Sequence, residues 1–190
     1  LFQCGDEFKG QKPCFLIGAA AAPFADPVKF RPYRLGKKVN AGADFIQTQL
    51  VYDIEAFEEY MDKVRELGLH EQTSILAGVG PLKSPGMARY MKKNVPGILV
   101  PDKIIDRMSE AGKPWSDIKK EDRTKEDKKA RSQAWRKEGI QICVDLIKEL
   151  QKIEGVAGVH IMAIEWEEAV KPIVEGAGLH PRPEMKTPVL

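Results

Sequence analysis

Four short apolar runs, each followed by a segment with helical periodicity, constrain the fold of this chain more than any other feature. The runs have the length and composition of buried β-strands and occupy residues 13–21, 43–51, 73–80 and 158–164. Strands that are almost continuously apolar are typical of parallel sheets, because crossover helices cover them. The alternation therefore predicts an α/β fold built on a parallel sheet.

Helix signals follow each predicted strand. Residues 27–42 close on an Ala-Gly pair that is typical of a helix C-terminus. Asp53 is placed as the N-cap of a helix that carries apolar residues at helical spacing and stops at Gly68. Further helical segments are predicted at residues 87–91, 102–108 and 165–178.

Four β/α units can form an open sheet or half of an eight-stranded (β/α)8 TIM-type barrel. The sequence contains neither G-x-G-x-x-G nor a P-loop, so a nucleotide site of the usual doubly wound kind has no support from motifs. A barrel active site uses polar residues at the carboxyl ends of its strands. Such residues are Gln49, Asp53, Lys83, Ser84 and Glu165.

Charge and hydropathy limit the classes of partner. A formal net charge of +2 over 190 residues argues against nucleic acid or an anionic membrane as the main partner. The longest apolar run, residues 14–25, is shorter than a spanning helix and contains Pro23, so no membrane span is expected. Three cysteines at unpatterned spacings fit a reducing cytoplasm. Because the chain begins at Leu1 without a signal pattern, we expect a piece of a longer polypeptide.

Histidines offer little chemistry. His70, His160 and His180 have no second ligand nearby in the sequence, so we expect no metal site. His160 lies inside a predicted strand and is interpreted as a core residue.

One segment departs from the β/α pattern as a charged helical insertion at about residues 113–138. Residues 119–137 hold nine Lys or Arg against four Asp or Glu. This charged arm is interpreted as a solvated helix that leads into a core helix, or as a docking surface for another subunit. Trp115 and Trp135 flank the arm, and aromatic residues often anchor interfaces.

Two glutamines interrupt the second apolar run. Gln47 and Gln49 are two positions apart, so they are expected on one face of the strand, with Ile46, Thr48 and Leu50 on the other. A buried amide without partners is costly. We therefore expect each glutamine to bond a neighbouring strand end or a ligand.

The stretches "GAAAAPFADP", "LGKKVNAGADFIQTQLVYD", "ILAGVGPL" and "GVHIMAIEWEEA", in this order, resemble the methylenetetrahydrofolate reductase family. The resemblance runs from about Cys14 to Gly178. It implies a flavin-dependent barrel, with FAD as cofactor, that reduces 5,10-methylenetetrahydrofolate to 5-methyltetrahydrofolate by hydride transfer. Residues 1–190 would then be a partial TIM barrel that supplies about the last four β/α units.

The resemblance also implies substrate-binding residues. The family's folate-binding glutamine corresponds to Gln49, whose amide can both donate to and accept from the edge of a pterin ring. A second folate-binding glutamine and a phenylalanine correspond to Met87 and Met91. Methionine can cover an aromatic face but cannot make the hydrogen bonds of glutamine.

Cofactor contacts carry over with departures. A flavin-contacting tyrosine corresponds to Ala22 and a nearby histidine to Asp26, so the flavin must be held differently there. An asparagine that contacts the cofactor corresponds to Arg34. Lys37 and Lys38 match basic residues that face the flavin phosphates.

The electron donor and the catalytic acids are less well defined. An arginine that contacts the pyridine nucleotide in bacterial relatives corresponds to Trp166, which brings direct use of NAD(P)H into question. The expected partners are therefore a redox partner subunit or further copies of this chain in a homo-oligomer. The family's acidic residues lie on earlier strands, so catalytic residues are expected outside this chain. Two alternatives stay open: a pterin-binding methyltransferase barrel without flavin, and a non-catalytic interaction module.

Overall fold

A computed structural model describes residues 10, 14–119 and 121–181 of the chain. The strands are β1 (Gly18–Ala21), β2 (Phe45–Leu50), β3 (Ser74–Val79) and β4 (Val156–Ile161). The α-helices are α1 (Arg31–Asn40), α2 (Ile54–Glu66), α3 (Pro85–Asn94), α4 (Asp102–Ala111), α5 (Lys113–Ser116), α6 (Lys125–Leu150) and α7 (Val170–Gly176). Short 3-10 helices are η1 (Val28–Phe30), η2 (Leu69–Glu71) and η3 (Glu167–Ala169). The predicted order of strands and helices is thus confirmed.

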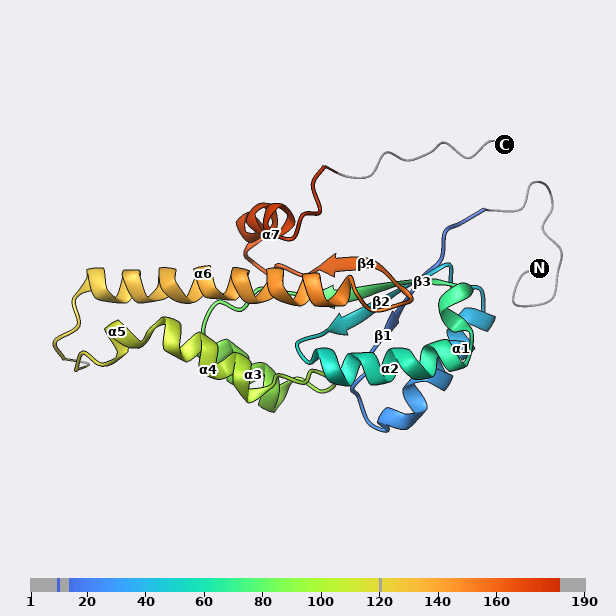
Figure 1. Cartoon of the computed structure of the whole chain (residues 1–190), viewed down its shortest axis with the longest axis horizontal. Helices are drawn as coiled ribbons and strands as arrows, with labels where there is room; N and C mark the ends of the chain where they lie inside the picture. Colours follow the sequence, from blue (N-terminus) through green and yellow to red (C-terminus); the bar gives the residue numbers. More distant parts are fainter. Residues whose placement is uncertain (1–9, 11–13, 120, 182–190) are drawn as a thin grey trace.

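The strands form one parallel sheet with the order β1-β2-β3-β4 (Figure 1). Sequential order of parallel strands is the arrangement found in (β/α)8 barrels, whereas a doubly wound sheet reverses its strand order at a switch point. The expected α/β fold of barrel type is therefore confirmed, with four strands in the described part of the chain.

Helices cover one face of this sheet. The larger apolar cluster joins outward-facing strand residues such as Ile46 and Ile75 to residues of α1, α2, α6 and α7. In β2 the outward residues are buried and the alternate residues are half-buried, because no helix in the described residues covers the inner face. Helices on a single face are what a segment of a barrel requires, since the barrel interior is filled by side chains of its own strands.

A second apolar cluster lies beyond the carboxyl ends of the strands. It joins Leu50 and Tyr52 to Leu82 and to residues of α3, α4 and α6. The Tyr52 hydroxyl donates to the Gly80 carbonyl over 3.0 Å. This cluster fixes the loops that follow β2 and β3.

Caps set the starts of the helices. The Asp53 carboxylate accepts from Ala56 N over 3.1 Å, which confirms Asp53 as the predicted N-cap of α2. Ser84 caps α3 in the same way by accepting from Met87 N. Gly68 has a φ of 63°, a left-handed conformation that ends the turn after α2 and favours glycine.

The charged segment is one part of a longer helical unit. Its carboxyl-terminal part and the apolar residues that follow form a single helix, α6, of 26 residues. The amino-terminal half of α6 packs against α4 and α5, which run beside it in Figure 1. Trp135 is half-buried and lies under the Arg131 guanidinium, 4.8 Å from the ring centre. It is therefore less free to anchor a partner than the sequence indicated.

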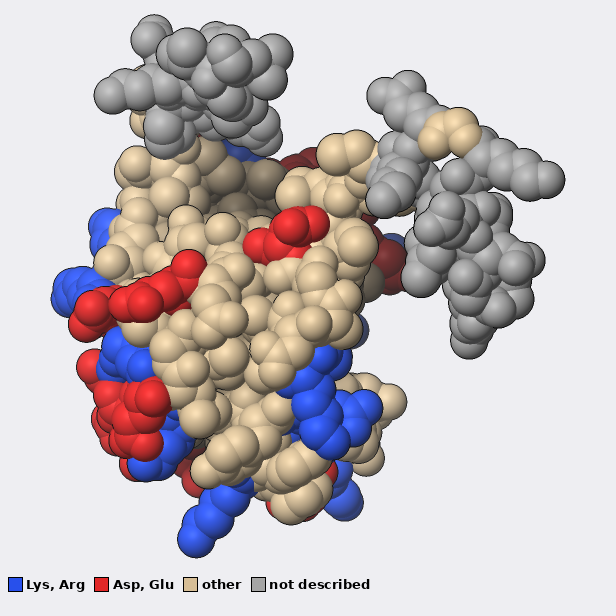
Figure 2. All heavy atoms as spheres, turned by 90° about the vertical axis from the view of Figure 1, so that its right-hand side faces the viewer, with Lys and Arg blue, Asp and Glu red and all other residues tan. Residues whose placement is uncertain are grey.

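Charged side chains on the end of the molecule shown in Figure 2 gather mainly at its left edge, where acidic and basic groups adjoin. Uncharged residues form most of the middle of this view. Pairs such as Lys63–Glu66, at 2.7 Å on α2, show the same mixing. No helix in the described ranges is both long and apolar enough to cross a membrane.

Candidate functional site

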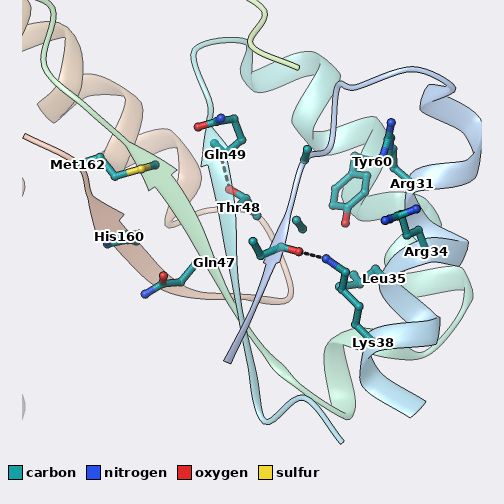
Figure 3. Close-up of a pocket in the computed structure, with 13 residues that line it drawn as sticks. Arg31, Arg34, Leu35, Lys38, Gln47, Thr48, Gln49, Tyr60, His160 and Met162 are labelled. Atoms are coloured by element: carbon teal, nitrogen blue, oxygen red, sulfur yellow. Dashed lines mark hydrogen bonds between the residues drawn. The ribbon is translucent and has the colours of Figure 1, made fainter. Parts of the chain in front are cut away.

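A cavity of about 450 Å³ lies at the β1 edge of the sheet and reaches both faces of that strand (Figure 3). Two of its walls are polar: one comes from the inner face of the sheet and the other from α1. The lining residues are Ala20, Ala21, Ala22, Arg31, Arg34, Leu35, Lys38, Gln47, Thr48, Gln49, Tyr60, His160 and Met162.

The inner wall carries the two glutamines. Gln47 and Gln49 both line the cavity, as their spacing predicted. The Gln49 side-chain oxygen Oε1 accepts from Leu50 N over 3.0 Å, which holds the amide close to its own strand. Ile46, Thr48 and Leu50 alternate with the glutamines and are buried, as expected, although Leu50 packs in the second cluster and Ile46 in the first.

His160 and Met162 extend the inner wall from β4. Val159 and Ile161 pack against the outer cluster, so the alternate residue His160 faces the opposite way. Its Nδ1 is buried and has no hydrogen-bond partner in the described part of the chain. His160 is therefore a cavity residue and not a residue of the outer apolar core, in contrast to the interpretation from sequence.

The second wall is basic and comes from one face of α1. Arg31, Arg34 and Lys38 recur at i, i+3 and i+7, which places them on one stripe of the helix. Arg31 donates to the Ala25 carbonyl over 2.6 Å and to the Asp26 carbonyl. Lys38 donates to the Ala20 carbonyl, as the dashed line in Figure 3 shows. Arg34 is exposed and points into the same space.

Small side chains separate the two polar walls. Ala20 and Ala21 end β1, Ala22 follows it, and all three line the cavity. Tyr60 reaches the cavity from α2 on the outer side (Figure 3). Burial raises the pKa of the Tyr60 phenol, so the hydroxyl stays protonated and can donate a hydrogen bond.

The structure brings four of the eight proposed ligand-binding residues together. Gln49, Ala22, Arg34 and Lys38 all line this one cavity. Their common location follows from the parallel sheet, which places the end of β2 beside the end of β1, and from α1, which packs beside β1.

The other four lie elsewhere. Lys37 points away from the cavity, with its ammonium 5.6 Å from the centre of the Phe30 ring. Asp26 is exposed outside the lining, and only its carbonyl is engaged, by Arg31. Met91 is 8% exposed within the second cluster, and its sulfur lies 3.7 Å from the Tyr52 hydroxyl. Met87 is half-buried beside Lys83 N.

Trp166 is buried, with 6% of its surface exposed, in the larger cluster. The guanidinium of Arg136, from α6, lies 5.2 Å from the centre of its ring. The indole is thus a packing residue, and the arginine that lies beside it comes from a different element of the chain.

Sequence reasoning missed Arg31, Tyr60, His160 and Met162 as lining residues. The helical spacing of Arg31 with Arg34 and Lys38 was a signal that could have identified Arg31 as a lining residue. The alternation of His160 with Val159 and Ile161 could have identified His160. Tyr60 belonged to an apolar helical stripe, and nothing in that pattern distinguishes a cavity residue from a core residue.

Comparison with known proteins adds an independent finding. The sequence model of the methylenetetrahydrofolate reductase family matches residues 9–178. Methylenetetrahydrofolate reductase 1 of Schizosaccharomyces pombe is 28% identical over 170 residues, which cover 87% of this chain and 24% of that protein. The probable methylenetetrahydrofolate reductase (NADPH) of Caenorhabditis elegans is 25% identical over 169 residues, covering 87% of this chain and 22% of that protein. The chain thus spans about a quarter of the length of these curated relatives.

One solved structure is similar at a TM-score of 0.49 and 18% identity, over 85% of this chain and 52% of that chain. It is an uncharacterized protein from Clostridium thermocellum that binds two copies of 5-methyl-5,6,7,8-tetrahydrofolic acid. A likeness of this extent carries no argument about the cavity.

Proposed function

The chain belongs to the methylenetetrahydrofolate reductase family, and we propose that its cavity holds the flavin and the folate during reduction of 5,10-methylenetetrahydrofolate to 5-methyltetrahydrofolate. One observation carries the proposal: the cavity joins an amide-lined wall to a basic wall across a strip of alanines. An amide suits a pterin edge, cationic groups suit a pyrophosphate, and small residues allow a flat ring to approach the backbone.

Gln49 is the proposed folate contact. It stands on the inner face at the carboxyl end of β2, where a barrel keeps its reacting groups. Its Oε1 is already bonded to Leu50 N, so the amide has a fixed orientation and its NH2 group can donate to a ring acceptor. Gln47 and His160 line the same inner wall and complete the polar surface that a pterin would meet.

The FAD fits the opposite wall. Arg34 and Lys38 would hold its pyrophosphate, and Arg31 would keep the 22–27 loop in place through its bonds to Ala25 and Asp26. The strip Ala20–Ala22 would lie against the flat ring, where no bulky side chain intervenes. When bound, the flavin supplies the hydride that reduces the methylene carbon. The residues of this chain orient the two rings and exclude water between them.

The proposed barrel needs more strands than the four described. Within the described residues β1 pairs only with β2, and β4 only with β3, so each has one free edge. Further strands from another segment or chain would pair with these edges and cover the inner face. We place the acidic residues of the reaction on those strands.

The surroundings of Trp166 bear on the source of electrons. The buried Trp166 offers no charge to a dinucleotide phosphate, and the guanidinium of the exposed Arg136 beside it lies over the indole ring. We therefore propose that a partner protein, and not NAD(P)H, reduces the flavin, with the charged arm as its docking surface. Under anaerobic conditions NADH and NADPH should each leave the flavin oxidised. Rapid bleaching by either nucleotide without added protein would overturn this step.

Binding spectroscopy tests the site. The purified protein should show the visible spectrum of bound FAD, and added 5-methyltetrahydrofolate should perturb that spectrum. The Gln49→Ala variant should keep the flavin and bind folate about tenfold more weakly, as expected for one lost hydrogen bond. Folate binding without any flavin would favour the methyltransferase alternative. Binding of neither ligand would favour the interaction module.

A further inference from the structure

The pairing of β2 with β3 contains an irregularity next to the proposed folate contact. Gln47 pairs with Leu76, but the next paired residues are Leu50 and Gly78, so β2 has one residue more than β3 in this interval. Such a β-bulge turns the strand and re-aims the side chains that follow it. Gln49 lies inside the bulge.

The Thr48 side chain bridges the bulge. Thr48 is 3% exposed, and its Oγ1 accepts a hydrogen bond from Gly78 N over 2.8 Å. The same hydroxyl donates to the backbone oxygen of Gln49 over 2.9 Å. It thus gives the buried Gly78 N–H a partner at the point where the ladder of backbone bonds is interrupted.

Gly78 allows the two strands to approach closely here. A Cβ at this position would lie 2.4 Å from the Thr48 carbonyl oxygen and 2.9 Å from that of Gln49. No side chain fits at this distance, so the bulge requires glycine on β3 and a short hydroxyl side chain on β2. Valine would match the shape of Thr48 but would leave Gly78 N–H without its partner.

From these contacts we propose that Thr48 is a positioning residue for Gln49, an inference that rests on the proposed function. In a regular register Gln49 would pair with Gly78, but here Leu50 pairs with Gly78 and Gln49 is left over inside the bulge, so other contacts have to hold it. Thr48 supplies one such contact by donating to the Gln49 backbone oxygen, while Leu50 N holds the Gln49 side-chain oxygen. The amide is then held from both its backbone and its side chain.

Hydrogen exchange tests the proposal without turnover. In the full chain, Thr48→Val should lose protection at Gly78 N–H and also at Leu50 N–H, whose acceptor is the Gln49 side chain. Thr48→Ser, which keeps the hydroxyl, should retain protection at both. Loss of protection at Gly78 N–H alone, with Leu50 N–H protected as in the wild type, would overturn the proposal. Thr48 would then stabilise the pairing of β2 with β3 without positioning Gln49.

Folate binding gives a second test. Thr48→Val should weaken binding of 5-methyltetrahydrofolate by roughly tenfold at unchanged flavin affinity, and Thr48→Ser should restore it. If Thr48 acts through Gln49, the double variant Thr48→Val/Gln49→Ala should bind no more weakly than Gln49→Ala alone. Additive losses would refute the proposal. If Gln49→Ala leaves folate binding unchanged, the proposed function fails at this residue, and hydrogen exchange still decides the role of Thr48.

Discussion

Replacing Gly139 with alanine tests how α6 is seated against the loop after β3. Gly139 is a buried residue of α6, and a Cβ there would lie 1.8 Å from the carbonyl oxygen of Leu82, in the loop after β3. An ordinary C···O contact is about 3.3–3.6 Å, so helix and loop would have to separate by about 1.5 Å. Overpacking of this kind costs up to about 3 kcal/mol, and the better helix propensity of alanine returns about 1 kcal/mol.

The expected net loss in the free energy of unfolding is therefore about 2 kcal/mol, or a decrease of about 4–8 °C in Tm for a chain of this length. Gly36→Ala is the matched control: Gly36 also lies within a helix, α1, but its added Cβ would meet only Leu69 side-chain atoms at 3.6 and 3.7 Å. That variant should be more stable than the wild type by up to about 1 kcal/mol. Urea unfolding measures the free energy of unfolding of both variants, provided that the m-value is the same as in the wild type. A Gly139→Ala protein as stable as Gly36→Ala would refute the close contact between α6 and Leu82.

Further predictions concern the cavity and the core. Replacing Arg34 and Lys38 with methionine should lower flavin occupancy at low salt, and the difference from the wild type should shrink at high salt, whereas Lys37→Met should leave occupancy unchanged; equal losses in all variants would contradict the assigned wall. Gln49→Ala should not alter the salt dependence of flavin binding, because its amide faces the other wall. Burial raises the pKa of Cys143 from 9.0 to about 12, so its contribution to stability is complete below pH 9 and is lost as pH rises toward 12. The free energy of unfolding should thus fall less steeply over this range in Cys143→Ala than in the wild type, and parallel curves would exclude the effect.

The sheet could be predicted from sequence because strand and helix periodicities are local. The near-continuous apolar character of residues 43–51 and 73–80 indicated parallel strands, and Asp53 marked the start of α2 correctly. The bulge in β2 could not be predicted, because it depends on a contact between Thr48 and Gly78 that only the pairing of two strands creates.

The site was predictable only where spacing fixes direction. Gln49 and Lys38 lie in the cavity, but the adjacent Lys37 does not, because neighbours on a helix point about 100° apart. Met91 was expected at the ligand from resemblance alone. In the structure Met91 packs in the apolar cluster around Tyr52. Methionine suits an apolar core and a ligand face equally well, so the residue type alone could not distinguish the two roles.

Anaerobic single turnover tests the central claim most directly. The flavin of the protein is first reduced chemically, 5,10-methylenetetrahydrofolate is then added, and the visible absorbance of oxidised flavin is followed while the folate products are quantified. We expect that the flavin is reoxidised with formation of one 5-methyltetrahydrofolate per flavin, and that Gln49→Ala slows this step while keeping its flavin. A flavin that stays reduced in the presence of the folate, with no 5-methyltetrahydrofolate formed, would contradict the account.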